Sequence, residues 1–359
     1  MHRNTEARID LQAICANLEL ARELSPQARQ VAVVKANAYG HGLVAVARAL
    51  QGKAEALAVA FIDEALELRE AGIPGPLLVL EAVNSREAWQ EAVAHELTLV
   101  VNAPEQVAEL KKAKLAAPLP VWVKVDTGMH RLGFPPVDLG TILEQLRSSA
   151  AIPEVICTHL ARADEADSET VRRQVELFDE CAAGHSLPLS IANSAGVLAW
   201  QKSHADWNRP GYMLYGNSPL QAETEATRRL QPAMTLTSEL IAIRRIGPGE
   251  TVGYGGRWVA RRPSVIGTIA AGYADGYPRH APDGTPILVA GHLSPLAGTV
   301  SMDMITVDLT EHPGAAVGDA VELWGRNVAV NDVAARAGTI GYELLTRVSS
   351  RVPRRYEAS

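Results

Sequence analysis

Lys35 is the residue of this sequence whose surroundings best suit covalent chemistry. It follows the apolar run Val31–Val34 and precedes small and turn-forming residues, in the stretch VAVVKANAYGHG. A short apolar run that ends in turn residues is typical of a buried parallel strand, so Lys35 is expected where a strand leaves the core. A desolvated lysine becomes the nucleophilic amine that a Schiff base requires. The other interpretation is an ordinary lysine that extends from a strand end to solvent.

Other polar residues follow apolar runs in the same way. They are Tyr39, Lys124, Asp126, Arg131, His159, Asn193, Ser194, Arg209, Gly211 and Tyr212. Taken alone, a histidine such as His159 is more often a hydrogen-bonded structural residue than a catalyst. Their shared position makes these residues candidates, because the active-site groups of a parallel barrel lie at the carboxyl ends of its strands.

Ser194 and Gly211 suit a bound phosphate. Ser194 offers a hydroxyl and a backbone N–H at the start of an expected helix, and Gly211 lets the backbone approach an anion closely. Barrels frequently hold phosphate after their seventh and eighth strands. A phosphate site together with a strand-end lysine suggests pyridoxal phosphate as the cofactor. The other interpretations are a plain helix N-cap at residues 193–194 and an ordinary loop at residues 209–211.

The elements that would position these residues alternate regularly between strand and helix over residues 1–232. A first helix is expected at Ile9–Glu23, with Asp10 as its N-cap. The expected strands are Val31–Lys35, Leu57–Ile62, Leu77–Glu81, Leu97–Val101, Val121–Val125, Val155–Thr158, Leu189–Ala192 and, more weakly, Asp206–Arg209. The helices expected after them are Leu43–Leu50, Asp63–Ala71, Glu87–His95, Glu105–Lys114, Leu139–Arg147, Glu169–Ala182 and Ala195–Lys202. Eight such units close most simply as a TIM-type (β/α)8 barrel.

A doubly wound open sheet is the alternative to the barrel. That fold normally shows a G-x-G-x-x-G loop after its first strand, and AYGHG does not have this spacing.

Residues 233–359 are predicted to form a second, mostly-β domain. Short β-type runs split by Gly and Pro turns replace the long amphipathic segments there. This region contains Tyr254, between glycines in TVGYGGRW, and Tyr273, in AAGYADGYPR. A tyrosine between glycines packs poorly as a core residue, so we expect exposure to a ligand or a partner chain. The other interpretation is an aromatic side chain that covers a turn.

Composition excludes several classes of function. Net charge is −7 over 359 residues, which argues against nucleic acid as the main partner. No apolar run reaches the roughly 18 residues of a membrane span, and MHRNTEARID lacks the pattern of a signal peptide. Three widely spaced cysteines predict neither a disulfide framework nor a zinc site. A cytoplasmic protein without a metal is therefore expected.

Taken together, the motifs resemble those of alanine racemases, the pyridoxal-phosphate enzymes that interconvert L- and D-alanine. The resemblance covers essentially the whole chain, in order, through VVKANAYGHG, KVDTGMHRLG, THLARADE, ANSAG, RPGYMLYG, VGYGGRW, GYADGYPR, SMDM and GYELL. It implies a homodimer whose active sites are completed by the partner chain. It also implies a role in supplying D-alanine for peptidoglycan or in alanine catabolism.

The same resemblance implies roles for individual residues. Lys35 holds pyridoxal 5'-phosphate covalently, and Tyr254, contributed by the other subunit, is the second base. The remaining assignments are Tyr39, Ser194, Gly211, Tyr212 and Tyr342 at the cofactor phosphate, Arg209 at the pyridine nitrogen, Arg131 near the cofactor phenolic oxygen, His159 between Arg209 and Tyr254, Met302 and Tyr273 at the substrate, and Lys124 as a lysine that some members carry carboxylated. Small departures occur at Trp258 and Ser301, where some members have tyrosine and cysteine.

Other functions compete with this interpretation. A second barrel-type pyridoxal-phosphate enzyme, either a decarboxylase or a broad-specificity racemase, would share most of these residues. A non-catalytic pyridoxal-phosphate carrier resembles the barrel alone, so the β domain that carries Tyr254 speaks against it. A barrel enzyme acting on a sugar phosphate would use Lys35 as an ordinary Schiff-base lysine.

Overall fold

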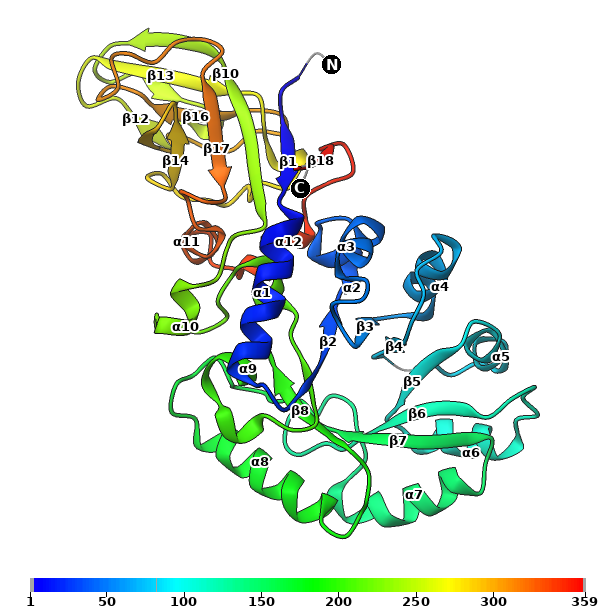
Figure 1. The fold of residues 1–359 in the computed structure, drawn as a ribbon. Helices are drawn as coiled ribbons and strands as arrows, with labels where there is room; N and C mark the ends of the chain where they lie inside the picture. Colours follow the sequence, from blue (N-terminus) through cyan, green and yellow to red (C-terminus); the bar gives the residue numbers. More distant parts are fainter. Residues whose placement is uncertain (1–2, 82, 358–359) are drawn as a thin grey trace. The chain divides into compact units, whose positions relative to one another are not determined.

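A computed structural model describes residues 3–81 and 83–357 of the chain, which divide into two compact units (Figure 1). The barrel unit consists of residues 14–38 and 42–230. The β unit consists of residues 3–13, 39–41 and 231–357 of the described chain.

Eight parallel strands close the barrel unit into a ring. They are β2 (Arg29–Val33), β3 (Ala56–Val59), β4 (Leu77–Val79), β5 (Leu97–Val101), β6 (Leu119–Lys124), β7 (Ala151–Cys157), β8 (Leu189–Asn193) and β9 (Trp207–Arg209). Strand β2 pairs with both β3 and β9, so the sheet has no edge. The expected TIM-type barrel is therefore confirmed, and the open-sheet alternative is wrong.

Helices lie on the outside of this ring; the first of them precedes β2, and the others come after barrel strands (Figure 1). They are α1 (Leu11–Leu24), α3 (Leu43–Leu50), α4 (Ile62–Glu70), α5 (Arg86–Ala94), α6 (Pro104–Lys112), α7 (Leu139–Arg147), α8 (Glu169–Ala182), α9 (Ser194–Ala199) and α10 (Glu225–Arg228), with 3₁₀ turns η1 (Pro136–Asp138), η2 (Gln201–Ser203) and η3 (Tyr212–Tyr215). Helix α7 shows why such helices can be predicted from the sequence. Its buried residues, Leu139, Ile142, Leu143 and Leu146, recur at helical spacing and form one apolar stripe.

The segment after β2, labelled α2 (Lys35–Tyr39), is not a right-handed helix. Ala36, Asn37 and Ala38 have φ of 54°, 55° and 52° with ψ of 53°, 45° and 52°, and Tyr39 has φ of 51°. Left-handed backbone costs about 1–2 kcal/mol per L-residue, so consecutive residues in this region must be held by their surroundings. The strand expected to run to Lys35 ends at Val33, because the chain enters this turn.

The β unit is built around the long strand β10 (Met234–Ile246). Strand β10 pairs with β1 (Glu6–Ile9), β13 (Ser264–Ile269) and β17 (Ala320–Trp324). The other elements are β11 (Thr251–Val252), β12 (Trp258–Val259), β14 (Pro286–Val289), β15 (His292–Pro295), β16 (Ile305–Asp308), β18 (Arg354–Tyr356), α11 (Val330–Arg336), α12 (Gly341–Thr346), η4 (Tyr254–Gly256) and η5 (Tyr273–Asp275). The expectation of a mostly-β second domain is thus confirmed.

Strand β1 belongs to the β unit. It pairs antiparallel with β10 and parallel with β18. The expected division into residues 1–232 and 233–359 does not anticipate that residues 3–13 pack with the β unit. Helix α1 starts at Leu11 rather than Ile9 because Ile9 still belongs to β1, and Asp10 Oδ1 accepts the Ala13 N–H at 2.9 Å as the expected N-cap.

Hydropathy along the described helices stays below what a bilayer crossing needs. Among residues 3–81 and 83–357, none combines the length and the apolar character of a membrane-spanning helix.

Candidate active site

Lys35 lies just beyond the carboxyl end of β2 and is partly buried. Its Nζ is 3.5 Å from Oε1 of Glu81, with the two side chains 33% and 23% exposed. The amine is therefore paired with a carboxylate rather than extended freely into solvent. Glu81 was not among the predicted site residues. It follows β4 as Lys35 follows β2, so the strand-end rule that selected Lys35 could also have selected Glu81.

Ser194 and the backbone after Gly211 form a cluster of hydrogen-bonding groups at the ends of β8 and β9. Ser194 Oγ accepts N–H groups from Gly211 at 2.8 Å and from Met213 at 3.2 Å. Asn193 caps α9 by accepting the Gly196 N–H at 3.0 Å, so the N-cap interpretation holds for Asn193 while the Ser194 hydroxyl faces the next loop. Tyr212 begins the 3₁₀ turn η3 and is buried.

Arg209 is buried in the barrel unit, and His159 lies partly buried beside it. The guanidinium of Arg209 donates to Ser190 Oγ at 2.5 Å and to the Thr158 carbonyl at 2.6 Å, and its Nη2 lies 3.5 Å from His159 Nδ1. Burial holds the pKa of His159 well below its ordinary value, and the charges of Arg209 and Lys124 lower it further. His159 is therefore a neutral imidazole beside a permanent cation.

Lys124, at the end of β6, lies in the same charged group. Burial lowers the pKa of Lys124, the positive charges of Arg209 and Arg131 lower it further, and the Glu81 carboxylate opposes that shift. Cys157 is opposite Lys124 in the pairing of β6 with β7. Burial raises the pKa of this thiol, so it stays protonated near neutral pH.

Asp126 builds the loop that carries Arg131. Its Oδ1 accepts the N–H groups of Gly128, Met129 and His130, each at 3.0 Å. Gly133 completes the loop with φ of 130°, and a Cβ there would lie 2.6 Å from the Asp126 nitrogen. Only glycine fits this position, so the loop and Arg131 are fixed by backbone geometry.

Four of the predicted site residues of the β unit lie in two groups, and the fifth is Tyr254. The rings of Tyr39 and Tyr342 lie 6.0 Å apart, and burial raises the pKa of the Tyr39 hydroxyl strongly. Tyr273 begins η5, and its N–H bonds the Ser301 carbonyl at 3.0 Å, next to Met302. A Cβ at Gly272 would lie 2.3 Å from the Met302 carbonyl oxygen, so glycine permits this close approach. Tyr254 is 73% exposed.

The structure thus sorts the predicted residues between the two units. The barrel unit contains Lys35, Lys124, Arg131, His159, Ser194, Arg209, Gly211 and Tyr212, and the β unit contains Tyr39, Tyr254, Tyr273, Met302 and Tyr342. Charge interactions link Lys124, Arg131, His159 and Arg209 into one group. The positive charge of Lys35 also lowers the pKa of His159.

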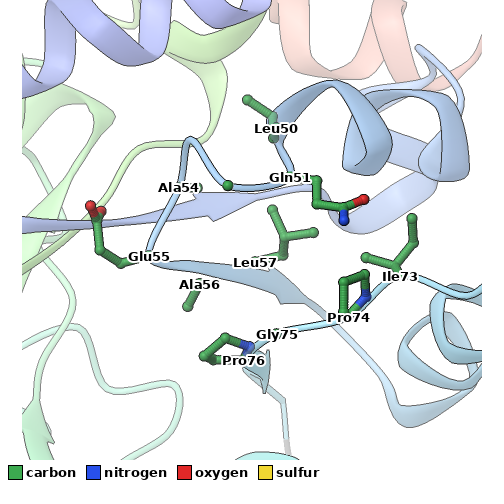
Figure 2. Close-up of a pocket in the computed structure, with 11 residues that line it drawn as sticks. Leu50, Gln51, Ala54, Glu55, Ala56, Leu57, Ile73, Pro74, Gly75 and Pro76 are labelled. Carbon is green, nitrogen blue, oxygen red and sulfur yellow. The ribbon is translucent and has the colours of Figure 1, made fainter.

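An apolar pocket of about 360 Å³ lies at the other ends of the barrel strands (Figure 2). It is lined by the loops before β3 and β4, and Leu50, Leu57 and Ile73 are among its residues. The one charged side chain in its lining, Glu55, accepts hydrogen bonds from Arg22 and the Gln30 N–H.

The barrel site fits pyridoxal phosphate by the chemistry of its donors. Ser194 offers a hydroxyl that can donate to a phosphate at the start of α9, and Lys35 offers an amine that suits a carbonyl carbon. Arg209 places a permanent positive charge in the same unit. A closed parallel barrel with this set of groups, followed by a mostly-β unit, is the architecture that the sequence motifs lead us to expect of a barrel-type pyridoxal-phosphate enzyme.

Comparisons with known proteins identify the family within this class. Residues 9–219 match the alanine racemase N-terminal domain, and residues 233–356 match the alanine racemase C-terminal domain. The chain belongs to the alanine racemase family.

Relatives of known name cover the chain almost completely. An alanine racemase from Azoarcus sp. is 50% identical over 99% of both chains, and one from Chromohalobacter salexigens is 49% identical over 99% of this chain and 98% of its own. The crystal structure of a biosynthetic alanine racemase from Pseudomonas aeruginosa matches with a TM-score of 0.96 at 46% identity, covering 99% of this chain and all of the other.

Proposed function

We propose that this chain interconverts L-alanine and D-alanine with pyridoxal 5'-phosphate as its cofactor, and that it works as a cytoplasmic homodimer. The observation that carries the proposal is the strand-end amine of Lys35 in the same barrel as the Ser194 cluster, in a chain that belongs to the alanine racemase family over its full length. The free thiols of Cys15, Cys157 and Cys181 suit a reducing compartment.

Several of the predicted residues would hold the cofactor. Lys35 would bind it covalently, and Ser194 with the backbone at Gly211 and Tyr212 would bind its phosphate, together with Tyr39 and Tyr342. Arg209 would face the ring nitrogen. Because its guanidinium stays protonated, it would leave that nitrogen largely unprotonated. When bound, pyridoxal phosphate supplies the electron sink that makes the α-proton of an amino acid acidic.

Two proton-carrying groups are needed, because racemisation removes a proton from one face of the α-carbon and returns one to the other. In our proposal Nζ of Lys35 takes the proton of D-alanine, and Oη of Tyr254 takes that of L-alanine. A phenol is a poor base near neutral pH unless its anion is stabilised. Arg131 and the His159–Arg209 pair would supply positive charge for that purpose.

Other residues would orient the substrate. Met302, through its backbone, and Tyr273 would contact the substrate, and Arg131 would lie near the cofactor phenolic oxygen. Lys124 corresponds to the lysine that some family members carry carboxylated. Its buried position favours the neutral amine that carboxylation requires, because burial lowers its pKa.

A chiral assay of the purified protein tests the function. We expect alanine to be racemised fastest, serine more slowly, and leucine or lysine very poorly, because Tyr254, Tyr342 and Met302 would crowd the side-chain space and overpacking costs about 1–3 kcal/mol. Rapid turnover of lysine, or decarboxylation of any amino acid, would contradict the proposal. Borohydride reduction followed by peptide mapping should find the cofactor on Lys35, and its recovery on another lysine would overturn that assignment.

Both physiological roles of alanine racemases occur among the relatives. A catabolic alanine racemase from Pseudomonas aeruginosa is 47% identical, and the biosynthetic one from the same organism is 46% identical. We propose that the D-alanine serves peptidoglycan synthesis or that the enzyme takes part in alanine catabolism. Growth of a deletion strain with and without D-alanine distinguishes the two roles.

A further inference from the structure

Glu64 links the turn after Lys35 to a neighbouring loop of the barrel unit. Its Oε1 accepts the N–H of Ala36 at 2.6 Å, and its Oε2 accepts the N–H of Ala60 at 2.8 Å. Ala36 is the first left-handed residue after Lys35, whereas Ala60 directly follows β3. One carboxylate therefore joins the ends of two adjacent barrel strands.

Glu64 accepts more hydrogen bonds than a helix-capping side chain ordinarily does. Glu64 is the third residue of α4, and its weaker bond to the Phe61 N–H, at 3.4 Å, is the usual capping contact at that position. The bond to the Ala36 N–H joins α4 to a residue outside that helix. At 2.6 Å it is the shortest of the three hydrogen bonds that Glu64 accepts. Both oxygens of Glu64 must act as acceptors at the same time, which an ionised carboxylate does and an amide does not.

The turn has a second support on its far side. Oδ1 of Asn37 accepts the Leu43 N–H at 2.7 Å, and the Asn37 carbonyl accepts the Gly42 N–H at 3.0 Å. These bonds fix the end of the turn, and Glu64 fixes its beginning. Lys35 directly precedes the left-handed residues, so the direction of its side chain depends on how the turn begins.

We propose that Glu64 is a positioning residue, which holds the left-handed turn so that the Lys35 amine meets the cofactor in the reactive orientation. The proposal rests on the proposed function, in which Lys35 binds pyridoxal phosphate. A right-handed conformation is intrinsically favoured for Ala36, and relaxation towards it would shift the Lys35 backbone. Displacements of about 1 Å at a reacting group can cost about 100-fold in rate.

Glu64→Gln is the first test, because it places an amide NH₂ against one of the two N–H donors with little change in volume. We expect kcat to fall at least about 10-fold while KM for alanine changes less than about 2-fold. After removal of the cofactor, the variant apoprotein should also bind added pyridoxal phosphate covalently at Lys35 at least about 10-fold more slowly than the wild type. Timed borohydride quenching followed by peptide mapping measures this trapping rate.

Glu67→Gln is the matched control. It makes the same chemical change three residues further along α4, at an exposed position. Wild-type trapping and kcat are expected for this variant. If the wild type itself traps no cofactor on Lys35, the proposed function fails; if Glu64→Gln traps as fast as Glu67→Gln, only the positioning role fails.

Ala36→Gly separates positioning of the turn from support of α4. Ala36 is exposed, and glycine adopts the left-handed conformation as readily as the right-handed one, so this change lowers the cost of the turn without opening the core. Added to Glu64→Gln, it should restore the trapping rate at least about 3-fold, and alone it should change the rate less than about 2-fold. A double variant as slow as Glu64→Gln would overturn the proposal.

Discussion

At the scale of single residues, one substitution separates the two proposed bases. Tyr254→Phe removes the hydroxyl that would act on L-alanine but leaves Lys35 in place. We expect this variant to bind the cofactor, to lose racemisation in both directions, and to exchange the α-deuteron of D-alanine with solvent far faster than that of L-alanine. NMR of each deuterated enantiomer measures the two rates. Equal exchange from both enantiomers would mean that the two bases are wrongly assigned.

A neutral His159 has a consequence for stability in acid. Because the pKa of His159 is held well below 6.5 in the folded protein, the unfolded chain binds a proton below that pH while the folded chain does not. Stability should therefore fall as the pH drops below about 6.5, by about 1.4 kcal/mol per pH unit from this residue. Above that pH the residue is neutral in both states and contributes no pH dependence.

His159→Gln should remove this part of the acid dependence. Urea unfolding of the variant between pH 7 and 5.5 is expected to give a flatter pH profile than the wild type, whatever its absolute stability. Between pH 7 and 8 the profiles of the variant and the wild type should run parallel, because the His159 imidazole is neutral in both the folded and the unfolded chain there. An unchanged slope in His159→Gln would mean that this imidazole is protonated in the folded protein.

At the scale of elements, the loop after β6 depends on Gly133. Gly133→Ala would place a Cβ 2.6 Å from the Asp126 nitrogen at φ of 130°. We expect the unfolding free energy to fall by about 1–3 kcal/mol and kcat to fall about 10-fold or more, since the loop carries Arg131. Gly184→Ala, at φ of 85° with open space around it, should cost about 1 kcal/mol or less and leave kcat unchanged. Equal losses in both variants would refute the steric argument.

Periodic elements were predictable because burial imposes a period on their residues. Helices α3, α7 and α8 and strand β5 coincide with their expected bounds, since each presents a clear apolar face or run. Strand β1 was missed because four residues with two buried side chains carry little pattern, and its partners β10 and β18 are far away in the sequence. Pairing between distant segments is not encoded in local periodicity.

Some features of the candidate site could likewise be predicted from the sequence, and others could not. Lys35, His159, Ser194 and Arg209 could be found because each follows a strand, and parallel strands bring such residues to one end of a barrel. The left-handed turn could not be predicted, because Ala36 and Ala38 intrinsically favour the right-handed helix. Its conformation depends on Glu64, whose bond to Ala36 joins residues 28 positions apart.

At the scale of the whole molecule, the proposed bases lie in different units of the chain. Lys35 belongs to the barrel unit, whereas Tyr254 belongs to the β unit, where it is 73% exposed. A large aromatic side chain so exposed suits a surface that another chain covers. This division is the structural support for a homodimer in which each active site draws one base from each subunit.

Mixing two inactive variants tests the shared site directly. In a hybrid of Lys35→Ala and Tyr254→Phe chains, one site combines both defects, and the other combines an intact Lys35 with an intact Tyr254. Random exchange makes half of the dimers hybrid, each with one working site of two, so about a quarter of wild-type activity should return. Each variant alone should stay inactive, as should a mixture of either one with the double variant. Differently tagged chains report the exchange, and an inactive mixture in which hybrid dimers are recovered would exclude a site shared between subunits.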